Sequence, residues 1–193
     1  MRTASLNRTT KETNVDVTLA LDGSGTADIA TGVGFLDHML TALAKHARFD
    51  LSIRATGDLH IDDHHTAEDC ALTLGAAFDQ AIGSKAGIVR FGSAHAPLDE
   101  ALARAVVDLS GRPHATVVLG LTRDAIGGLA CENITHFFTS FAAAARLTLH
   151  LDVIRGENDH HKAEASFKAF ALALAQATRL TGEAGVPSTK GVL

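Results

Sequence analysis

The chain contains the segment Asp63-His64-His65-Thr66-Ala67-Glu68, and 96 positions later (63 to 159) it contains Asp159-His160-His161-Lys162-Ala163-Glu164. That interval is close to half of the 193 residues. Similarity at a fixed spacing is typical of a duplicated structural unit. The two segments therefore predict a fold made of two similar halves.

The sequence around these segments repeats as well. Phe35-Leu36-Asp37-His38 aligns with Asn133-Ile134-Thr135-His136 at an offset of 98 positions (38 to 136). No Pro- or Ser-rich linker separates the halves. We expect one domain, residues 1–193, built from two repeats that cover about 8–95 and 96–193.

Within each repeat the hydrophobic pattern predicts strands first and helices later. Leu51-Ser52-Ile53 and Leu149-His150-Leu151 lie in alternating apolar and polar runs, which are typical of half-buried strands. One hairpin is predicted around a turn at 22–25 and its counterpart around a turn at 110–113. The predicted strands of these hairpins include 15–21, 102–109 and 114–121. The predicted helices lie near 33–45, 64–82, 132–144 and 160–180. The fold class is therefore α+β, in which each half has a small antiparallel or mixed sheet with two helices on one face.

The composition limits the class of protein. The chain is 46% hydrophobic and 20% charged, as an ordinary globular protein is. Its net charge of -5 argues against nucleic-acid binding, which needs a concentrated basic face. Apolar runs are too short to cross a bilayer, and the polar segment Met1–Thr13 does not resemble a secretory signal, so we expect a cytoplasmic protein. Cys70 and Cys131 lack the paired spacing of a zinc or redox motif and are predicted to be buried, unreactive thiols.

The histidines are the unusual feature of this sequence. The chain has 11 of them but no Trp and no Tyr, and imidazole is the commonest metal ligand in proteins. Asp62 or Asp63, and likewise Asn158 or Asp159, are suitable N-cap residues, so each His-His pair is expected to open a helix. Adjacent side chains on a helix point about 100° apart, whereas residues three or four apart share a face. The geometry favours two ions, each of which takes one histidine from a pair.

Adding the repeat-related His38 and His136 gives a set of candidate metal ligands. The set is His38, His64, His65, Glu68, His136, His160, His161 and Glu164. It divides into two sites of three His and one Glu, whose N and O atoms suit Mn, Fe, Co or Zn. The alternative is that His-His-x-x-Glu is a capping pattern with solvated histidines, but two copies at equivalent positions favour metal binding. The histidines without a repeat partner are assigned to surface or packing roles, namely His60, His95, His114 and His150.

Some residues near turns and near the C-terminus could bind an anion. The segment Val186-Pro187-Ser188-Thr189-Lys190-Gly191 offers hydroxyls, backbone N–H groups and an ammonium, which together could hold a phosphate. A loose terminal tail is the alternative interpretation. Arg90 and Arg112 lie in turn-like contexts where a guanidinium could reach a phosphate, although they could also be ordinary surface arginines.

Five segments together resemble the signature segments of imidazoleglycerol-phosphate dehydratase. They are Gly34-Phe35-Leu36-Asp37-His38-Met39-Leu40, Asp62-Asp63-His64-His65-Thr66-Ala67-Glu68-Asp69, Asp108-Leu109-Ser110-Gly111-Arg112-Pro113, Asn158-Asp159-His160-His161-Lys162-Ala163-Glu164 and Pro187-Ser188-Thr189-Lys190-Gly191. The resemblance extends from about Arg8 to the last residue. It implies a hydro-lyase of histidine biosynthesis that converts imidazole-glycerol phosphate to imidazole-acetol phosphate, with two manganese ions per active site.

The same resemblance implies roles for individual residues. The metal ligands are the eight residues given above, Glu12 transfers protons, and His46 is another active-site residue. The residues that bind the substrate, chiefly its phosphate, are Arg90, Arg112, Lys168, Ser188, Thr189 and Lys190. The resemblance also implies a homo-oligomer of twenty-four subunits in which the metal sites lie between neighbours.

The substrate has no carbonyl group to acidify the proton next to the departing hydroxyl. We therefore expect its imidazole ring, held as an imidazolate by the two metal ions, to be the source of electrons, with Glu12 as acid or base. A dinuclear metallohydrolase is one alternative, and it would release inorganic phosphate rather than a ketone. A non-catalytic metal-storage or structural oligomer is another, and it explains the histidines but not the anion-binding groups.

Overall fold

The computed structural model describes residues 1–191 and residue 193. Each half of the chain has three strands, a helix, a strand and a second helix, and the second half has two additional short strands before its first helix. The elements of the first half are β1 Thr3–Thr9, β2 Thr13–Ala20, β3 Ala27–Ala30, α1 Gly34–Ala47, β4 Asp50–Gly57 and α2 His64–Ile82. Those of the second half are β5 Phe91–Leu98, β6 Ala101–Asp108, β7 His114–Val118, α3 Cys131–Ala144, β10 Thr148–Arg155 and α4 Asp159–Thr178, with the two-residue strands β8 Ala125–Ile126 and β9 Leu129–Ala130 before α3.

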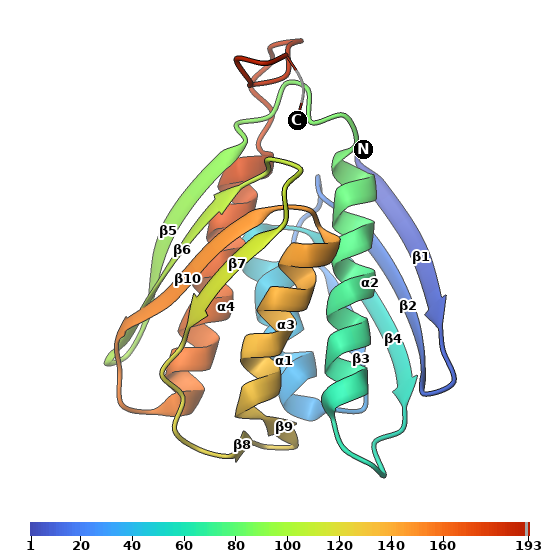
Figure 1. The fold of residues 1–193 in the computed structure, drawn as a ribbon, viewed down its shortest axis with the longest axis vertical. Coiled ribbons are helices and arrows are strands. Elements are labelled where there is room, and N and C mark those ends of the chain that lie inside the picture. The colour runs from blue at the N-terminus through green and yellow to red at the C-terminus, as the bar shows by residue number, and fades with distance from the viewer. Residues whose placement is uncertain (192) are drawn as a thin grey trace.

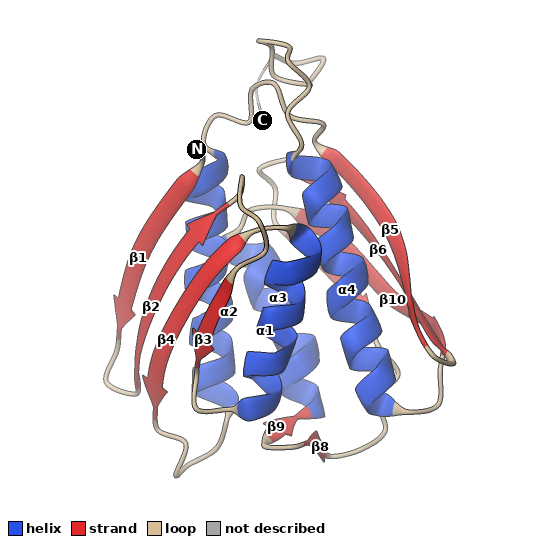
Figure 2. Ribbon diagram, turned by 180° about the vertical axis from the view of Figure 1, so that it is seen from behind, coloured by secondary structure: helices blue, strands red, loops and turns tan. Residues whose placement is uncertain are grey.

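Two four-stranded sheets lie on the outside of the molecule and the four helices lie between them (Figure 1, Figure 2). The strand orders are β1-β2-β4-β3 and β5-β6-β10-β7, so the sheets repeat each other. In each sheet one edge strand, β3 or β7, runs parallel to its neighbour, and the other pairs are antiparallel. The predicted α+β class, with mixed sheets covered by helices on one face, is confirmed.

The predicted hairpins around 22–25 and 110–113 are wrong. Strand β4 lies between β2 and β3, because Ile53 pairs with Val17 on one side and with Ile29 on the other. Strand β10 separates β6 and β7 in the same way, with Leu151 in the central position. The observed hairpins join β1 to β2 and β5 to β6, and the sequence pattern did not predict β1 or β5. A turn motif shows where a strand ends, but the choice of neighbour depends on residues distant in the chain.

The helices begin much as their sequences predict. Asp62 Oδ1 accepts a hydrogen bond from the His64 N–H at 2.9 Å, and Asn158 Oδ1 accepts one from the His160 N–H at 2.9 Å. These contacts satisfy amide donors that a helix leaves free in its first turn. All four helices start at the end of the molecule where the β8–β9 hairpin lies (Figure 1). The two His-His pairs are therefore brought to the same end of the fold.

The layer between the sheets is closely packed. Phe138 and Phe167 join α3 to α4 with ring centroids 4.5 Å apart, and both rings are fully buried. Gly75 lets α2 approach α3, since a Cβ atom there would lie 2.6 Å from the carbonyl oxygen of Phe141. Cys70 on α2 is buried and unpaired in the described part of the chain, as its apolar surroundings predict. Among the described residues, no helix has the length and apolar character to cross a bilayer.

Candidate metal centre

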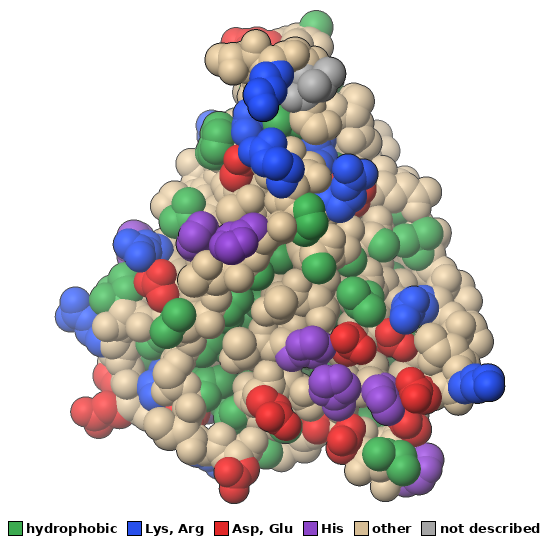
Figure 3. Space-filling view, in the orientation of Figure 1, with side chains coloured by type: hydrophobic (Ala, Val, Ile, Leu, Met, Phe, Trp, Pro, Cys, Tyr) green, Lys and Arg blue, Asp and Glu red, His purple; other side chains and the backbone are tan. Residues whose placement is uncertain are grey.

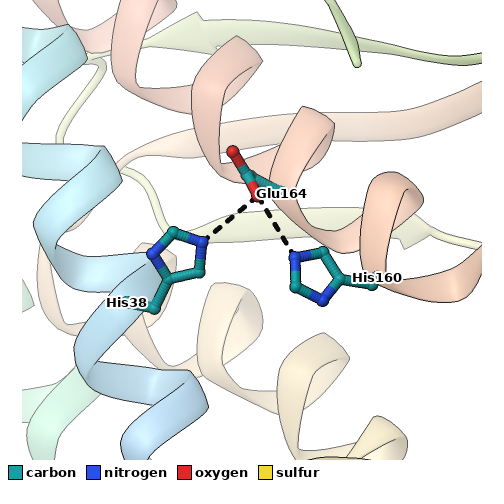
Figure 4. Close-up of side chains that lie close together, drawn as sticks. All are labelled: His38, His160 and Glu164. Carbon is teal, nitrogen blue, oxygen red and sulfur yellow. Dashed lines mark hydrogen bonds and ion pairs between the residues drawn. The ribbon is translucent and has the colours of Figure 1, made fainter. Parts of the chain in front are cut away.

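The first cluster of possible metal ligands joins α1 to α4 (Figure 4). His38 Nε2 lies 3.2 Å from Glu164 Oε2, and His160 Nε2 lies 3.3 Å from the same oxygen. His160 and Glu164 are one helical turn apart and share a face of α4, which is one of the two pairings that the spacing of the motif allows. One ligand atom from each of the three residues lies within 4.8 Å of the others.

The second cluster joins α2 to α3 and is related to the first by the repeat. It consists of His64, Glu68 and His136, again with one ligand atom from each within 4.8 Å of the others. His136 Nε2 lies 2.9 Å from Glu68 Oε1, and the rings of His64 and His136 stack with centroids 5.0 Å apart. The two clusters together contain six of the eight predicted ligands.

The other two predicted ligands, His65 and His161, lie outside the clusters of their own chain. Asp58 Oδ2 is 3.0 Å from His65 Nδ1, and Glu100 Oε2 is 2.7 Å from His161 Nδ1. A carboxylate at Nδ1 fixes the proton on that nitrogen and leaves the lone pair on Nε2. The expected sets of three His and one Glu are thus not complete within one chain, and each cluster has two His and one Glu.

The Nδ1 contacts also change the acidity of the paired groups. The hydrogen bond from His161 is the main reason that the pKa of Glu100 is lowered to about 2. The same bond raises the pKa of His161. Between Asp58 and His65 the hydrogen bond likewise lowers the pKa of the acid and raises that of the histidine. Both carboxylates are therefore ionised at neutral pH and act as acceptors toward Nδ1.

Two further predicted site residues, Lys168 and His46, lie beside the first cluster. Lys168 Nζ is 2.7 Å from Glu164 Oε1, while Oε2 of the same carboxylate contacts the histidines. Burial disfavours the charged form of Glu164, but Lys168 and His38 outweigh it and hold the pKa of that carboxyl below its ordinary value. Partial burial, followed by the charge of Lys168, lowers the pKa of His46. A lysine and a histidine thus lie beside the Glu164 carboxylate of the first cluster.

Glu12 lies in the turn between β1 and β2 and contacts His65, one of the two predicted ligands outside the clusters. Its side chain is 53% exposed, and Oε2 lies 3.8 Å from His65 Nε2. The structure therefore associates Glu12 with His65 rather than with either three-residue cluster of the same chain.

The remaining predicted substrate residues gather near the C-terminal loop. Arg90 Nη1 donates a hydrogen bond to the carbonyl oxygen of Pro187 at 2.8 Å, and Arg90 Nε lies 2.7 Å from Asp108 Oδ1. Pro187 directly precedes Ser188, Thr189 and Lys190, and Arg112 is exposed in the turn after β6. Figure 3 shows basic side chains gathered at this end of the molecule and a group of histidine and acidic side chains toward the opposite end, with other histidines at the upper left.

The basic end and the first cluster are far apart in a single chain. The Arg90 N–H donates to the carbonyl oxygen of Ala177 at 2.8 Å. Ala177 lies 13 residues beyond Glu164 on α4 (164 to 177), which is about 20 Å at 1.5 Å per residue. The backbone of Arg90 is therefore beyond the reach of a small molecule bound at the His38 cluster of the same chain.

The sequence interpretation missed Asp58 and Glu100. Glu100 is 61 positions from the histidine that it contacts, and nothing local marks it as a partner. Of the histidines assigned to other roles, His60, His95, His114 and His150 are all exposed. The rings of His114 and His150 lie 5.7 Å apart on the outer face of the second sheet. None of these four histidines belongs to a cluster of possible metal ligands among the described residues.

Comparison with known proteins agrees with these features. The sequence model of a family described as "Imidazoleglycerol-phosphate dehydratase" matches residues 31–174. A relative of that name from Kluyveromyces lactis is 52% identical, and the alignment covers 100% of this chain and 97% of the relative. Another from Phytophthora nicotianae is 63% identical over 100% of this chain, which spans 43% of that relative's length.

Solved structures show the same fold. The imidazoleglycerol-phosphate dehydratase of Staphylococcus aureus has a TM-score of 0.84 and 39% identity, with 92% of this chain and 99% of that chain covered. The enzyme from Pyrococcus furiosus, solved in complex with (S)-C348, has a TM-score of 0.85 and 40% identity, with 97% of this chain and 100% of that chain covered.

Proposed function

This chain belongs to the imidazoleglycerol-phosphate dehydratase family, and we propose that it performs the reaction of that name with two divalent metal ions bound by its histidines and glutamates. The reaction removes water from imidazole-glycerol phosphate, gives imidazole-acetol phosphate and is a step of histidine biosynthesis. The observation that supports metal use is the pair of repeat-related His–Glu clusters.

The donor atoms of each cluster fit a divalent ion. Two imidazole nitrogens and one carboxylate oxygen lie together in each, and such mixed N and O ligands suit Mn, Fe, Co and Zn. Three or four protein ligands leave positions on a six-coordinate ion for substrate and water. We propose manganese as the ion, in accordance with the family resemblance.

We propose that His65 and His161 complete the clusters of neighbouring copies of the chain. Carboxylates at Nδ1 leave the Nε2 atoms of both histidines as ligand atoms, and neither histidine joins a cluster among the described residues of its own chain. The rise of about 20 Å along α4 from Glu164 to Ala177, which the Arg90 backbone contacts, supports the same arrangement. The arginines that hold the phosphate and the metal ions of one site then come from different copies. The family resemblance implies a shell of twenty-four subunits.

When bound, the two ions supply positive charge that favours the deprotonated imidazole ring of the substrate, which then serves as the source of electrons for loss of the hydroxyl group. The residues of this chain bind and orient the substrate. Arg90, Arg112 and the loop with Ser188, Thr189 and Lys190 hold the phosphate, with Lys168 near the metal cluster. This placement brings the reacting carbon to a fixed position, and positioning alone can contribute several kcal/mol to catalysis.

Glu12 is assigned to proton transfer. Its exposed carboxylate lies 3.8 Å from Nε2 of His65, the proposed ligand of a shared site, so it faces the region where the substrate ring would bind. A carboxylate there can accept or donate the side-chain proton during formation of the ketone. His46 is assigned as a further active-site residue beside Lys168.

Turnover by metal-free and metal-loaded protein tests this function. Protein stripped with a chelator should give no ketone from imidazole-glycerol phosphate, and addition of Mn²⁺ should restore it. Release of inorganic phosphate instead would favour a metallohydrolase, and metal-dependent assembly without turnover would favour a storage protein. Absence of ketone with Mn²⁺, Fe²⁺, Co²⁺ and Zn²⁺, in folded and metal-loaded protein, would contradict the proposal.

A further inference from the structure

The turn that carries Glu12 is anchored to helix α2 by a buried carboxylate. Asp69 follows the proposed ligand Glu68 in α2, and only 4% of it is exposed. Its Oδ2 accepts a hydrogen bond from the hydroxyl of Thr13, and its Oδ1 accepts one from Arg8 Nε at 2.7 Å. Asp69 therefore contacts both strands of the β1–β2 hairpin next to the turn.

Thr13 connects this anchor to the backbone of Glu12. The Thr10 hydroxyl accepts hydrogen bonds from the N–H groups of Glu12, at 3.0 Å, and Thr13, at 2.9 Å. The Thr10 N–H in turn donates to the carbonyl oxygen of Thr13 at 2.9 Å. The position of Glu12 thus depends on a closed set of hydrogen bonds within the turn, and Asp69 links that set to the helix that bears Glu68.

The second half of the chain shows how the same place is filled without this network. The strand pairings and the offset between the two His-His segments relate Arg8, Thr13 and Asp69 to Ala96, Ala101 and Ala165. These alanines are all buried, with exposed fractions of 3%, 1% and 0%. The fold therefore packs well with small apolar side chains at these positions. The Arg8 side chain is 45% exposed, and an ion pair between such an arginine and a buried carboxylate is often no more stabilising than apolar packing. Stability therefore does not account for the polar network of the first half.

We propose that Asp69, acting through Thr13, is a positioning residue that holds Glu12 for proton transfer. This inference rests on the proposed function of the site and on the role of Glu12 in it. Catalysis is sensitive to misplacement of about 1 Å, so a looser turn lowers turnover more than it lowers substrate binding. In the second half the corresponding turn contains Glu100, which itself contacts His161 and so is held directly. In the first half it is Asp58 that contacts Nδ1 of the corresponding histidine, His65, so Glu12 needs a different anchor.

Substitutions of Thr13 test the anchor with little change in shape. Thr13→Val removes the hydroxyl and keeps the branched side chain, whereas Thr13→Ser keeps the hydroxyl. In the metal-loaded assembly, Thr13→Val should lower kcat by about ten- to a hundredfold and leave KM and Mn²⁺ affinity nearly unchanged, while Thr13→Ser should restore most of kcat. Asp69→Asn should resemble Thr13→Val. Asp152→Asn, which breaks the ion pair with Arg104 on the second sheet, is the matched control and should not affect kcat.

Combination with Glu12→Gln separates this inference from the proposed function. Thr13→Val should cause no further loss of turnover in the Glu12→Gln background, because the hydroxyl acts through Glu12; a further loss of equal size would show a merely structural role. If Glu12→Gln lowers kcat and Thr13→Val does not, the anchor is overturned while the function stands. If Glu12→Gln keeps normal turnover, the catalytic role of Glu12 is lost, and the anchor proposal with it.

Hydrogen exchange gives a measurement that does not depend on turnover. Amide protons of residues 10–13 should exchange faster in Thr13→Val than in the wild-type protein and in Asp152→Asn. Equal exchange in all three proteins would overturn the anchor.

Discussion

The Nε2 atom of His136 lies 2.9 Å from Oε1 of Glu68, although the two residues are 68 positions apart in the chain. His136 belongs to α3 in the second half, and Glu68 belongs to α2 in the first. The repeat-related contact between His38 and Glu164 joins α1 of the first half to α4 of the second. Each cluster therefore needs one helix from each half, and neither half alone contains a complete group of three ligands.

The clusters should bind metal separately. His136→Ala removes one ligand of the second cluster and leaves the first unchanged, so about half of the bound Mn²⁺ should be lost after stripping and reloading. His38→Ala should lose a similar share from the other cluster. Metal content can be measured by plasma mass spectrometry, with His95→Ala as a control histidine on the second sheet. Full metal content in both ligand variants would show that the clusters are not the binding sites.

Both cysteines should be protected in the folded protein. Burial raises the pKa of Cys70 to about 12 and also raises the pKa of Cys131. Because the thiolate is the reactive form, neither thiol should react with iodoacetamide at pH 8 until the chain is unfolded. Mass spectrometry counts the labels, and Thr116→Cys, on the exposed face of β7, supplies a thiol that reacts in the native state. Labelling of Cys70 in folded protein would contradict the buried position.

The ion pair of Arg2 and Asp22 should contribute to the pH dependence of stability. The hydrogen bond from the Arg2 side chain is the main reason that the pKa of Asp22 lies below its ordinary value of 3.8. A carboxyl with a lowered pKa in the folded state stabilises the fold above its unfolded pKa, and this contribution is lost as the pH falls through the folded pKa.

Asp22→Asn should therefore lower the free energy of unfolding at pH 6 and have a smaller effect near pH 3. Since 34% of the side chain is exposed, the difference should be about 1 kcal/mol or less. Urea unfolding at fixed protein concentration measures it. An equal effect at both pH values would show that the ion pair does not cause it.

Close packing of β5 against α4 should make Gly92 sensitive to substitution. A Cβ atom at Gly92 would lie 1.9 Å from the carbonyl oxygen of Ala173, so Gly92→Ala requires the strand to move away from the helix. Overpacking of this kind typically costs about 1–3 kcal/mol. Gly128→Ala is the matched control, because no atom of the described residues lies within 4 Å of its Cβ position. The midpoint temperature of thermal unfolding should be lower for Gly92→Ala than for Gly128→Ala. Equal midpoint temperatures would contradict the packing argument.

The sequence contained enough information to predict the helices but not the strand order. Helix α2 begins at His64 and ends at Ile82, as expected from its cap residues and its period. The neighbours of β4 could not be predicted in the same way. Ile53 pairs with Val17 and with Ile29. All three residues are apolar, so their pattern would equally fit a direct pairing of Val17 with Ile29 in a β2–β3 hairpin. Strand choice depends on tertiary packing, which a local pattern does not contain.

The candidate site was predictable where helix geometry determines it. Helix geometry allows either His160 or His161 to share a face with Glu164, because they lie four and three residues before it. The structure shows that His160 joins the cluster. The sequence could not show that Glu100 holds His161, because these residues meet only through the packing of β5, β6 and α4. Nor could it show the separation of Arg90 from the first cluster, which depends on the length and direction of α4.

Each cluster combines one helix from each half of the chain, and this arrangement bears on how the chain arose. An ancestral half-length polypeptide would have carried His, His and Glu on two helices that do not meet, so it could assemble a cluster only by forming a dimer. The two clusters of that dimer would have been identical by symmetry. Joining the halves in one polypeptide would remove this constraint and allow each side to accumulate substitutions independently. The pair Asp69 and Ala165 shows that the two sides have since diverged.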